Sequence, residues 1–370
     1  MNIETMIYAY LAVCASMIVF NCACIFVFRR RDRRLHRHSS RMEADILRQI
    51  RNIQAGEPVE ERHREFLRKK LVRTGGLMAF DETLERLLAQ TPGDVWAYLQ
   101  EIRPVFTYLA MENKYHSAMK LTYFAYVIRK YRIVEGKPIH VILDVMMKLL
   151  QEPSLYCREN ALQAIYSSGD CGCVLRALHT VDESGRFHHA KLLTDGLLTF
   201  GGERRRLTQA LWSAFESFSV PMQVVILDYV RFGGGDLREE LLELMADSRR
   251  DDEIRFSCIR YFGKYPYEPA FPLLIAFAER DREQRWEYAA IAATSLASYP
   301  GDRTVGVLKK ALNSSNWYVR FNAAKSLEGF HLTYLELSDV MESSDRYARE
   351  ILQYRMDIEN AREEQEAAPV

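Results

Sequence analysis

The feature that most constrains the fold is a repeat whose last copy contains the stretch Trp317–Leu327, WYVRFNAAKSL. Counting backwards from Ala323, apolar side chains recur at steps of 31, 34, 32, 33 and 32 residues. A second apolar column, which ends at Leu327, recurs at the same steps. The two columns are Ala161, Leu193, Ile226, Cys258, Ala292 and Ala323, and Ile165, Leu197, Val230, Phe262, Leu296 and Leu327. A period of this length is typical of stacked helix pairs, in which each pair packs only on its neighbours.

Each copy is expected to contain a helix, a turn with glycine and a second helix. The copies begin at Leu155, Phe187, Val220, Glu253, Trp286 and Trp317. Glycine is expected to end the first helix where a positive φ is needed, and an acidic residue after it can cap the next helix. The turns with both features are Gly169-Asp170, Gly201-Gly202-Glu203 and Gly301-Asp302, while Gly263-Lys264 lacks the acidic residue. The pattern predicts an all-α solenoid of about six to eight helical pairs over residues 115–333. Residues 334–356 should cap it, and residues 357–370 should form an acidic flexible tail.

Near the other end of the chain, Ile7–Phe28 has 22 consecutive positions without a charged residue, after a short segment 1–6. As a helix this run would be about 33 Å long, enough to cross a bilayer. A basic segment, residues 29–41, follows it, and basic residues keep their end of a spanning helix in the cytoplasm. We expect a single pass through the plasma (inner) membrane, with the N-terminus outside and the bulk of the chain cytoplasmic. The arginines expected on anionic headgroups are Arg29, Arg30, Arg31, Arg33, Arg34 and Arg37.

A cleaved signal peptide is the main alternative for the apolar run. Signal peptides have a basic front end and a shorter apolar core, whereas here the charge lies on the other side. The arginines can also be interpreted as a nucleic-acid patch or a specific lipid site, but their position directly after the expected spanning helix favours a topology determinant. Over the whole chain 50 basic residues balance 50 acidic ones, so no general preference for nucleic acid is expected. The seven cysteines are irregularly spaced and argue against a disulfide framework.

The segment between the membrane and the repeats, residues 42–114, has a charged helical pattern and is expected to be a stalk or a set of atypical capping repeats. Gly75-Gly76 is expected to close its first part, and Pro104 to kink a helix that runs from Trp96 to Asn113.

The repeats resemble a known family. Val319-Arg320-Phe321-Asn322-Ala323-Ala324-Lys325-Ser326-Leu327 matches the pattern Val-Arg-x-x-Ala-Ala-x-x-Leu of short, phycobilin-lyase-type HEAT repeats, and looser copies start at Cys157 and Ile254. In such repeats the arginine bonds an acidic or amide residue of the preceding linker. The resemblance therefore implies pairs of Arg255 with Asp251 or Asp252, and of Arg320 with Asn316.

The resemblance also implies that the helices with this motif line a concave face that binds protein. The position two residues after each Ala323 equivalent should point outwards on this face, together with nearby aromatic side chains. The expected binding residues are Gln163, Asp195, Asp228, Arg260, Thr294, Lys325, Tyr229, Tyr261 and Phe321. Trp286 and Trp317 are adjacent, with inter-repeat packing as the alternative role.

The sequence contains only weak matches to catalytic and metal-binding motifs. Cys171-Gly172-Cys173 has one intervening residue, whereas structural zinc sites usually have two to four, so no metal is expected. No His-Glu pair occurs, although the iron-dependent hydroxylases built from HEAT repeats resemble one another in carrying such pairs. Neither a phosphate-binding Gly-Lys loop nor Gly-x-Ser-x-Gly is present. We therefore expect no catalytic residues and no cofactor.

These patterns favour a membrane-tethered, non-enzymatic scaffold or adaptor that binds a membrane-associated protein, for instance a glycosyltransferase of surface polysaccharide. One alternative is a HEAT-like enzyme of the lyase or DNA glycosylase type. A glycosylase should have a basic groove, whereas the row of outward residues has mixed charge. The other alternative is a sensor whose array flexes when a ligand binds.

Overall fold

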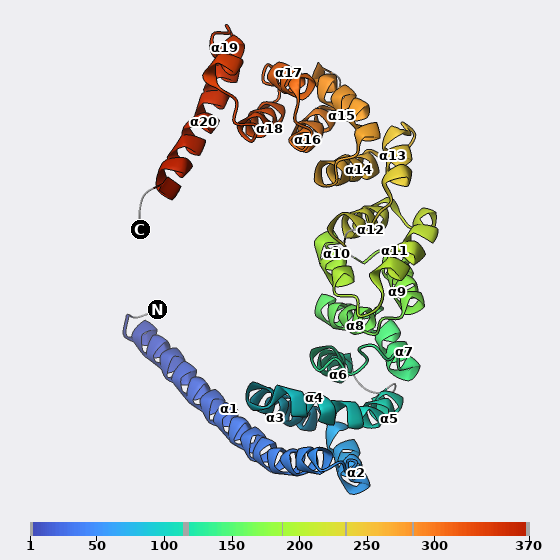
Figure 1. Ribbon diagram of the computed structural model, residues 1–370. Helices are drawn as coiled ribbons and strands as arrows, with labels where there is room; N and C mark the ends of the chain where they lie inside the picture. Colours follow the sequence, from blue (N-terminus) through green and yellow to red (C-terminus); the bar gives the residue numbers. More distant parts are fainter. Residues whose placement is uncertain (1–2, 114–117, 187, 234, 283–284, 368–370) are drawn as a thin grey trace. The chain divides into compact units, whose positions relative to one another are not determined.

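The computed structural model describes residues 3–113, 118–186, 188–233, 235–282 and 285–367, and every regular element in these ranges is a helix (Figure 1). The expected all-α class is therefore confirmed. The chain divides into two compact units. Unit 1 comprises Met1–Ser184 and Thr199–Gly202, and unit 2 comprises Gly185–Leu198 and Glu203–Val370.

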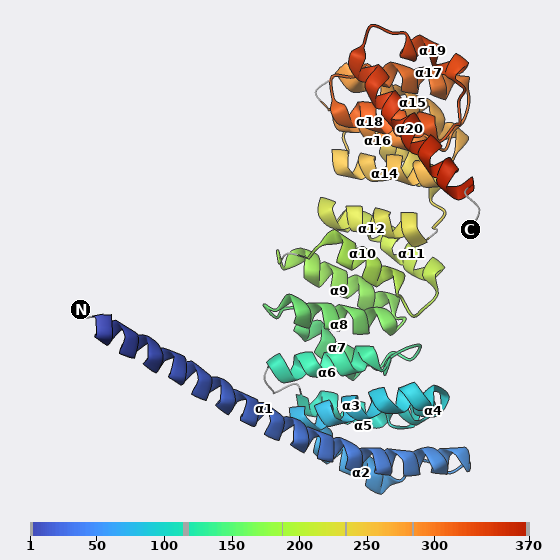
Figure 2. The same ribbon diagram turned by 90° about the vertical axis from the view of Figure 1, so that its left-hand side faces the viewer.

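In unit 1, shorter helices stack in two layers, and one long helix, α1, extends away from this stack (Figure 2). The helices are α1 (Ile3–Gln54), α2 (Glu61–Leu71), α3 (Thr74–Gln90), α4 (Pro92–Glu101), α5 (Arg103–Asn113), α6 (Ala118–Lys130), α7 (His140–Leu149), α8 (Leu155–Ser167) and α9 (Cys171–Glu183). One layer runs from α3 through α6 to α8, and the other from α5 through α7 to α9. The C-terminal part of α1 packs on α3 and α4, so residues 42–114 form part of this unit.

The apolar run, the basic segment and the start of the expected stalk lie in the single helix α1, because residues 29–54 contain no glycine or proline to end it. Two local expectations, those for Gly75-Gly76 and for Pro104, are wrong. Gly75 and Gly76 lie in the first turn of α3, where a Cβ on Gly76 would come within 2.0 Å of the Lys70 carbonyl oxygen. Pro104 kinks no helix: it occupies the first turn of α5, where its missing N–H costs nothing, and Ile102 separates α5 from α4.

In unit 2, first helices and second helices of the repeats form separate layers (Figure 1). The helices are α10 (Ala190–Leu198), α11 (Arg204–Ser213), α12 (Val220–Gly233), α13 (Arg238–Ala246), α14 (Asp252–Lys264), α15 (Phe271–Ala278), α16 (Trp286–Leu296), α17 (Asp302–Ala311), α18 (Trp317–Glu328), α19 (Tyr334–Met341) and α20 (Arg346–Ala367), with 3-10 turns at Phe215–Ser217, Glu268–Ala270 and Glu279–Arg282. Successive contacts join α10, α12, α14, α16 and α18, and α20 packs on the last of them. We call these five helices the first-helix layer.

The repeat register predicted from the sequence is confirmed by burial. Every side chain of the two apolar columns is at most 4% exposed. Four of the first helices begin at the predicted residue, namely α8, α12, α16 and α18. The helix α14 begins one residue early, and α10 begins at Ala190, while its predicted start, Phe187, lies outside the described residues. Burial of the same two positions in each copy is what stacks the helices, because each column fills the seam between neighbours.

The turn glycines have two different roles. Gly169 has a φ of 75°, and Asp170 after it accepts a hydrogen bond from the Cys173 backbone N–H at 2.9 Å, which caps α9 as predicted. Gly263, in contrast, has no positive φ, but a Cβ there would lie 2.6 Å from the Ser295 hydroxyl oxygen on the next first helix. The expected positive φ is thus wrong for this glycine, which is needed for close approach of α14 and α16.

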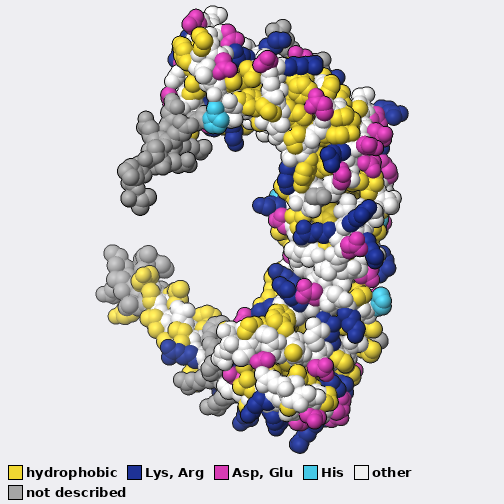
Figure 3. All heavy atoms as spheres, viewed as in Figure 1, with side chains coloured by type: hydrophobic (Ala, Val, Ile, Leu, Met, Phe, Trp, Pro, Cys, Tyr) yellow, Lys and Arg dark blue, Asp and Glu magenta, His cyan; other side chains and the backbone are white. Residues whose placement is uncertain are grey.

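The described apolar side chains in the N-terminal part of α1 are largely exposed, unlike those of its C-terminal part. They are exposed by 51–68% at Val13, Met17, Ile18, Val19, Phe20, Ile25 and Phe26. Figure 3 shows them in yellow along this helix. Over the described residues, no helix meets the length and hydropathy required to traverse a bilayer. Within the expected span and the basic segment, the side chains of Ile7, Ala9, Leu11, Val27, Phe28, Arg31, Arg33, Arg34 and Arg37 lie outside the described residues.

Candidate protein-binding surface

The expected outward row lies mostly on the first-helix layer of unit 2. Asp195, Thr294 and Lys325 are exposed on α10, α16 and α18, and Asp228 and Arg260 are half-buried on α12 and α14. Gln163 lies in unit 1 on α8, where its amide donates to Glu159 at 3.0 Å and accepts from Thr199 at 3.3 Å. The row in unit 2 is therefore accessible, with its acidic residues on α10 and α12.

Two of the expected binding residues, Tyr229 and Tyr261, are packing residues. They are 1% and 3% exposed, respectively, so their inclusion in an exposed surface is wrong. The hydroxyl of Tyr261 donates to the Gly235 carbonyl oxygen at 2.9 Å, and burial raises the pKa of this tyrosine. The physical reason is their position three residues after the buried column, which on a helix lies beside the same seam.

The centre of the row is a compact charged group on α12 and α14. The Asp228 carboxylate lies 2.9 Å from the Arg231 guanidinium, and burial raises the pKa of Asp228 although Arg231 and Arg260 oppose the shift. Burial also lowers the pKa of Arg231, whose Nε has no hydrogen-bond partner among the described residues. The Arg231 guanidinium stacks 4.5 Å from the centre of the Phe232 ring, which is 51% exposed. This part of the layer offers an aromatic side chain flanked by cations.

Towards the C-terminus the surface becomes strongly aromatic. Trp286 of α16 stacks on Tyr318 of α18 with ring centres 5.3 Å apart, and Trp317 stacks on Phe321 at 4.8 Å. Trp317 and Tyr318 are nevertheless 52% and 56% exposed. The Arg320 guanidinium lies 5.2 Å from the ring centre of Tyr347 on α20. We call this set the aromatic patch: Trp286, Trp317, Tyr318, Phe321, Tyr347 and Arg320.

The aromatic patch combines packing with exposure. Trp286 is half-buried and stacks between two repeats, which fits the inter-repeat packing role. More than half of the Trp317 side chain, in contrast, is exposed to solvent. Tryptophan, tyrosine and arginine are the side chains most enriched at energetic hot spots of protein interfaces. The stacked rings are also held in place before any partner arrives, which lowers the entropic cost of binding.

The repeat arginines bind the linkers, but through backbone carbonyls. Arg158 donates to the carbonyls of Glu152 and Pro153, Arg255 to that of Met245, and Arg320 to that of Ser314. The expected pairs with Asp251, Asp252 and Asn316 are wrong as direct contacts. Asp251 and Asn316 instead cap α14 and α18, and Asp252 accepts from the Tyr288 hydroxyl, which in turn accepts from Arg255. Short linker carboxylates satisfy helix N-termini before they reach the guanidinium.

Three cysteines of the repeats, Cys157, Cys173 and Cys258, are in buried environments that disfavour thiolate chemistry. Burial raises the pKa of Cys157 and Cys173, and it raises that of Cys258 to about 12. The sulfur of Cys173 accepts a hydrogen bond from Arg176 at 3.0 Å. Within the described part of the chain, no three His, Cys, Asp or Glu side chains are grouped so as to hold a metal.

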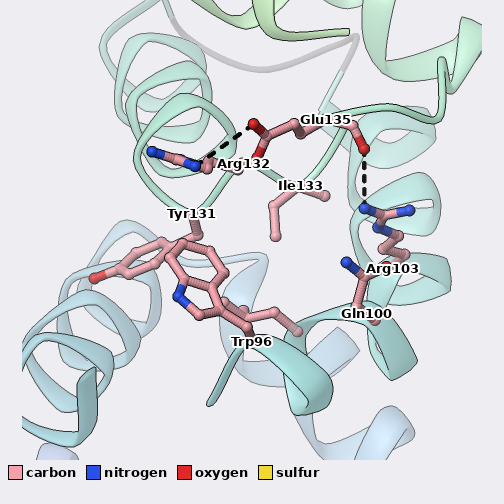
Figure 4. Close-up of a pocket in the computed structure, with 8 residues that line it drawn as sticks. Trp96, Gln100, Arg103, Tyr131, Arg132, Ile133 and Glu135 are labelled. Atoms are coloured by element: carbon pink, nitrogen blue, oxygen red, sulfur yellow. Dashed lines mark hydrogen bonds and ion pairs between the residues drawn. The ribbon is translucent and has the colours of Figure 1, made fainter. Parts of the chain in front are cut away.

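A cavity in unit 1 was not foreseen from the sequence. It has a volume of about 250 Å³ and lies between the end of α4, the start of α5 and the segment that follows α6 (Figure 4). Trp96 forms one wall, and Arg103 and Arg132 approach it from opposite sides. Both guanidiniums contact Glu135, Arg132 through the carboxylate at 3.5 Å and Arg103 through the backbone carbonyl at 3.2 Å. No single periodic signal marks these residues, because they come from α4, the start of α5 and the irregular segment after α6.

Comparison with known proteins gives little. No family model matches the chain, and no curated protein matches it. Solved structures do match, among them human deoxyhypusine hydroxylase in complex with glycerol, which is 15% identical over 80% of this chain and 96% of that chain, with a TM-score of 0.27. A TM-score this low supports neither a shared fold nor a shared activity.

Proposed function

We propose that the protein is a non-enzymatic scaffold, tethered to a membrane, that binds a partner protein through the first-helix layer of unit 2. The observation that carries the proposal is the aromatic patch, in which Trp317, Tyr318 and Tyr347 keep more than half of their surface exposed although Trp317 and Tyr318 stack on neighbouring rings and Tyr347 faces the Arg320 guanidinium. Monomeric soluble proteins rarely expose clustered large rings of this kind without a partner. The resemblance of the repeats to HEAT repeats supports the same role.

The tether in this proposal is the apolar run of α1. Its described side chains are exposed apolar groups on a helix with no neighbour over these residues, and they are followed by Arg29 and Arg30. We place the N-terminus outside and the repeats on the cytoplasmic side, with the basic segment on anionic headgroups. Confinement to a membrane would raise the effective concentration of any membrane-bound partner. A membrane enzyme such as a surface-polysaccharide glycosyltransferase is one partner of this class.

The tether can be tested by location. A variant that lacks residues 1–28 should leave the membrane fraction, and a reporter fused after Val370 should be active in the cytoplasm. A reporter that is active only outside the cytoplasm would reverse the topology and the choice of partner with it.

The binding surface can be tested by site-specific crosslinking in the native membrane. A photoreactive phenylalanine analogue at Trp317 or Tyr318 should form a crosslink to one identified protein, whereas the same analogue at the exposed Gln209 of α11 should not. Trp317→Ala combined with Tyr318→Ala should weaken binding of that protein about 30-fold, because a hot-spot truncation costs about 2 kcal/mol. Equal crosslinking from both faces would argue against a specific surface.

A further inference from the structure

A second recess lies next to the Trp96 cavity in unit 1. It has a volume of about 720 Å³ and is lined by α2, α5 and the segment up to Ile139. Gln100 and Arg103 line both spaces, and residues of the 131–139 segment line both as well. The two recesses are thus neighbours that share these lining residues, and we call them together the Arg103 groove.

One wall of the groove is built at a conformational cost. Arg132 has a φ of 48°, at the position after α6 where the Ile133 N–H reaches back to the Ile128 carbonyl at 3.1 Å. This backbone arrangement ends many helices, and glycine normally occupies the left-handed position. The side chain gains little in return, since it is 62% exposed, lies 3.5 Å from Glu135 and is 5.8 Å from the centre of the Trp96 ring. Stability alone therefore does not explain an arginine here.

The charges of the groove are unequal. Arg64, Arg103, Arg132 and Lys137 line it, against the carboxylates of Glu101 and Glu135. Arg64 is neutralised by Glu61 and Glu101 at 3.3 and 3.5 Å. Among the described residues, neither Arg103 nor Lys137 forms an ion pair with a carboxylate, so two cations remain for a ligand. Guanidinium groups bind carboxylates with two parallel hydrogen bonds, which gives both strength and orientation.

The same groove exposes apolar surface. Tyr108 and Met111, one turn apart on α5, are 40% and 48% exposed. Pockets for small molecules usually enclose most of the ligand. Here Arg132, Glu135, Tyr108 and Met111 are all open to solvent, so an extended occupant that alternates anionic and apolar groups fits better than a compact one.

We propose that the Arg103 groove binds an acidic peptide segment of a partner protein. Its carboxylates pair with Arg103, Arg132 and Lys137, and an apolar side chain of the segment packs on Tyr108 and Met111. This site is distinct from the aromatic patch, which belongs to unit 2.

The probe is a displayed library of random short peptides, selected against the full chain in detergent micelles. Enriched peptides should contain Asp or Glu together with Leu, Ile or Phe, and their affinity should fall as salt is raised. The variant Arg132→Gly should weaken a selected peptide about ten-fold, because a charge-assisted hydrogen bond is lost. It should also raise the melting temperature of unit 1, because glycine relieves the backbone. If Arg132 had only a structural role, Arg132→Gly would not lower the affinity for the peptide while raising the melting temperature.

Two further variants make the result decisive. Arg103→Gln should weaken the peptide by a similar factor, while Arg48→Gln, which removes an exposed arginine of the same unit outside the groove, should leave it unchanged. Selected peptides without acidic residues, or peptides that bind Arg103→Gln as tightly as the unmodified chain, would overturn the proposal. The variant Trp317→Ala should not affect peptide binding, so failure here and failure of the aromatic patch can be told apart.

Discussion

Acid should destabilise unit 1 through one buried histidine. His63 on α2 is 3% exposed, and its Nε2 lies 2.7 Å from the hydroxyl of Tyr98, which is fully buried on α4. Burial lowers the pKa of His63 from 6.5 to about 4, opposed in part by the charge of Asp45. The folded chain therefore holds this imidazole neutral at a pH at which the unfolded chain would protonate it.

The sign and size of the effect follow from proton linkage. Well above pH 6.5 both states are neutral at this position, and the histidine makes no difference to the pH dependence of stability. As the pH falls towards about 4, only the unfolded state gains the proton, so the free energy of unfolding decreases. A difference of about 2.5 pKa units at 1.36 kcal/mol each gives a total loss of about 3 kcal/mol. About 2 kcal/mol of it should already be lost at about pH 5.

The assay is equilibrium unfolding in urea of the full chain in detergent, with Trp96 as the sole tryptophan after Trp212, Trp286 and Trp317 are changed to phenylalanine. Trp96 lies on α4 with Tyr98 and reports on unit 1. The free energy of unfolding is measured at about pH 7.5 and at about pH 5, for the single-tryptophan protein that keeps His63 and for the same protein with His63→Gln. Carboxylates affect both proteins equally and cancel in the difference. Parallel pH curves for the two proteins would refute the assignment of a buried neutral imidazole.

Other predictions follow from close contacts and buried polar groups. Gly263→Ala should destabilise unit 2 by about 1–3 kcal/mol in thermal unfolding, because its Cβ would clash with Ser295. Gly306→Ala, which has open space around it inside α17, should stabilise the same unit by about 0.5–1 kcal/mol in that assay. Asp81 accepts from Tyr123, Lys130 and Tyr131 at 2.6–2.7 Å, so Asp81→Ala should cost unit 1 about 3 kcal/mol in urea unfolding, and a loss below 1 kcal/mol would contradict this network.

The repeat was the most predictable part of the molecule because it depends on burial alone. An apolar side chain at a fixed helical position must be removed from water in every copy, so the columns through Ala323 and Leu327 identified both the period and four helix starts. The N-terminal helices were less predictable. Gly75, Gly76 and Pro104 are usual helix breakers, yet they occupy first turns, where a missing N–H or Cβ is tolerated or required.

The candidate surface was partly predictable for the same reason. The outward row needs only the helical period, and Asp195, Thr294 and Lys325 are exposed as that period requires. The burial of Tyr229 and Tyr261 could not be predicted in this way. Each follows the outward position by one residue, and whether a ring there packs between two helices or points to solvent depends on the neighbouring helix. The Arg103 groove combines side chains of α2, α4 and α5 with the irregular segment after α6, and no single helical period relates these elements.

Among the described residues, two other than glycine have a left-handed backbone, and they show what sets such positions. Arg132 and His331 have φ values of 48° and 50°, while Gly329, directly after α18, is helical with a φ of −65°. The hydrogen bonds at a helix end fix which residue turns, and the sequence at that residue need not be glycine. A side chain retained there against its backbone preference therefore indicates another constraint. At Arg132 we attribute this constraint to the neighbouring Arg103 groove, which has an excess of cations. The variant Arg132→Gly should therefore stabilise unit 1 while it weakens the binding of an acidic peptide.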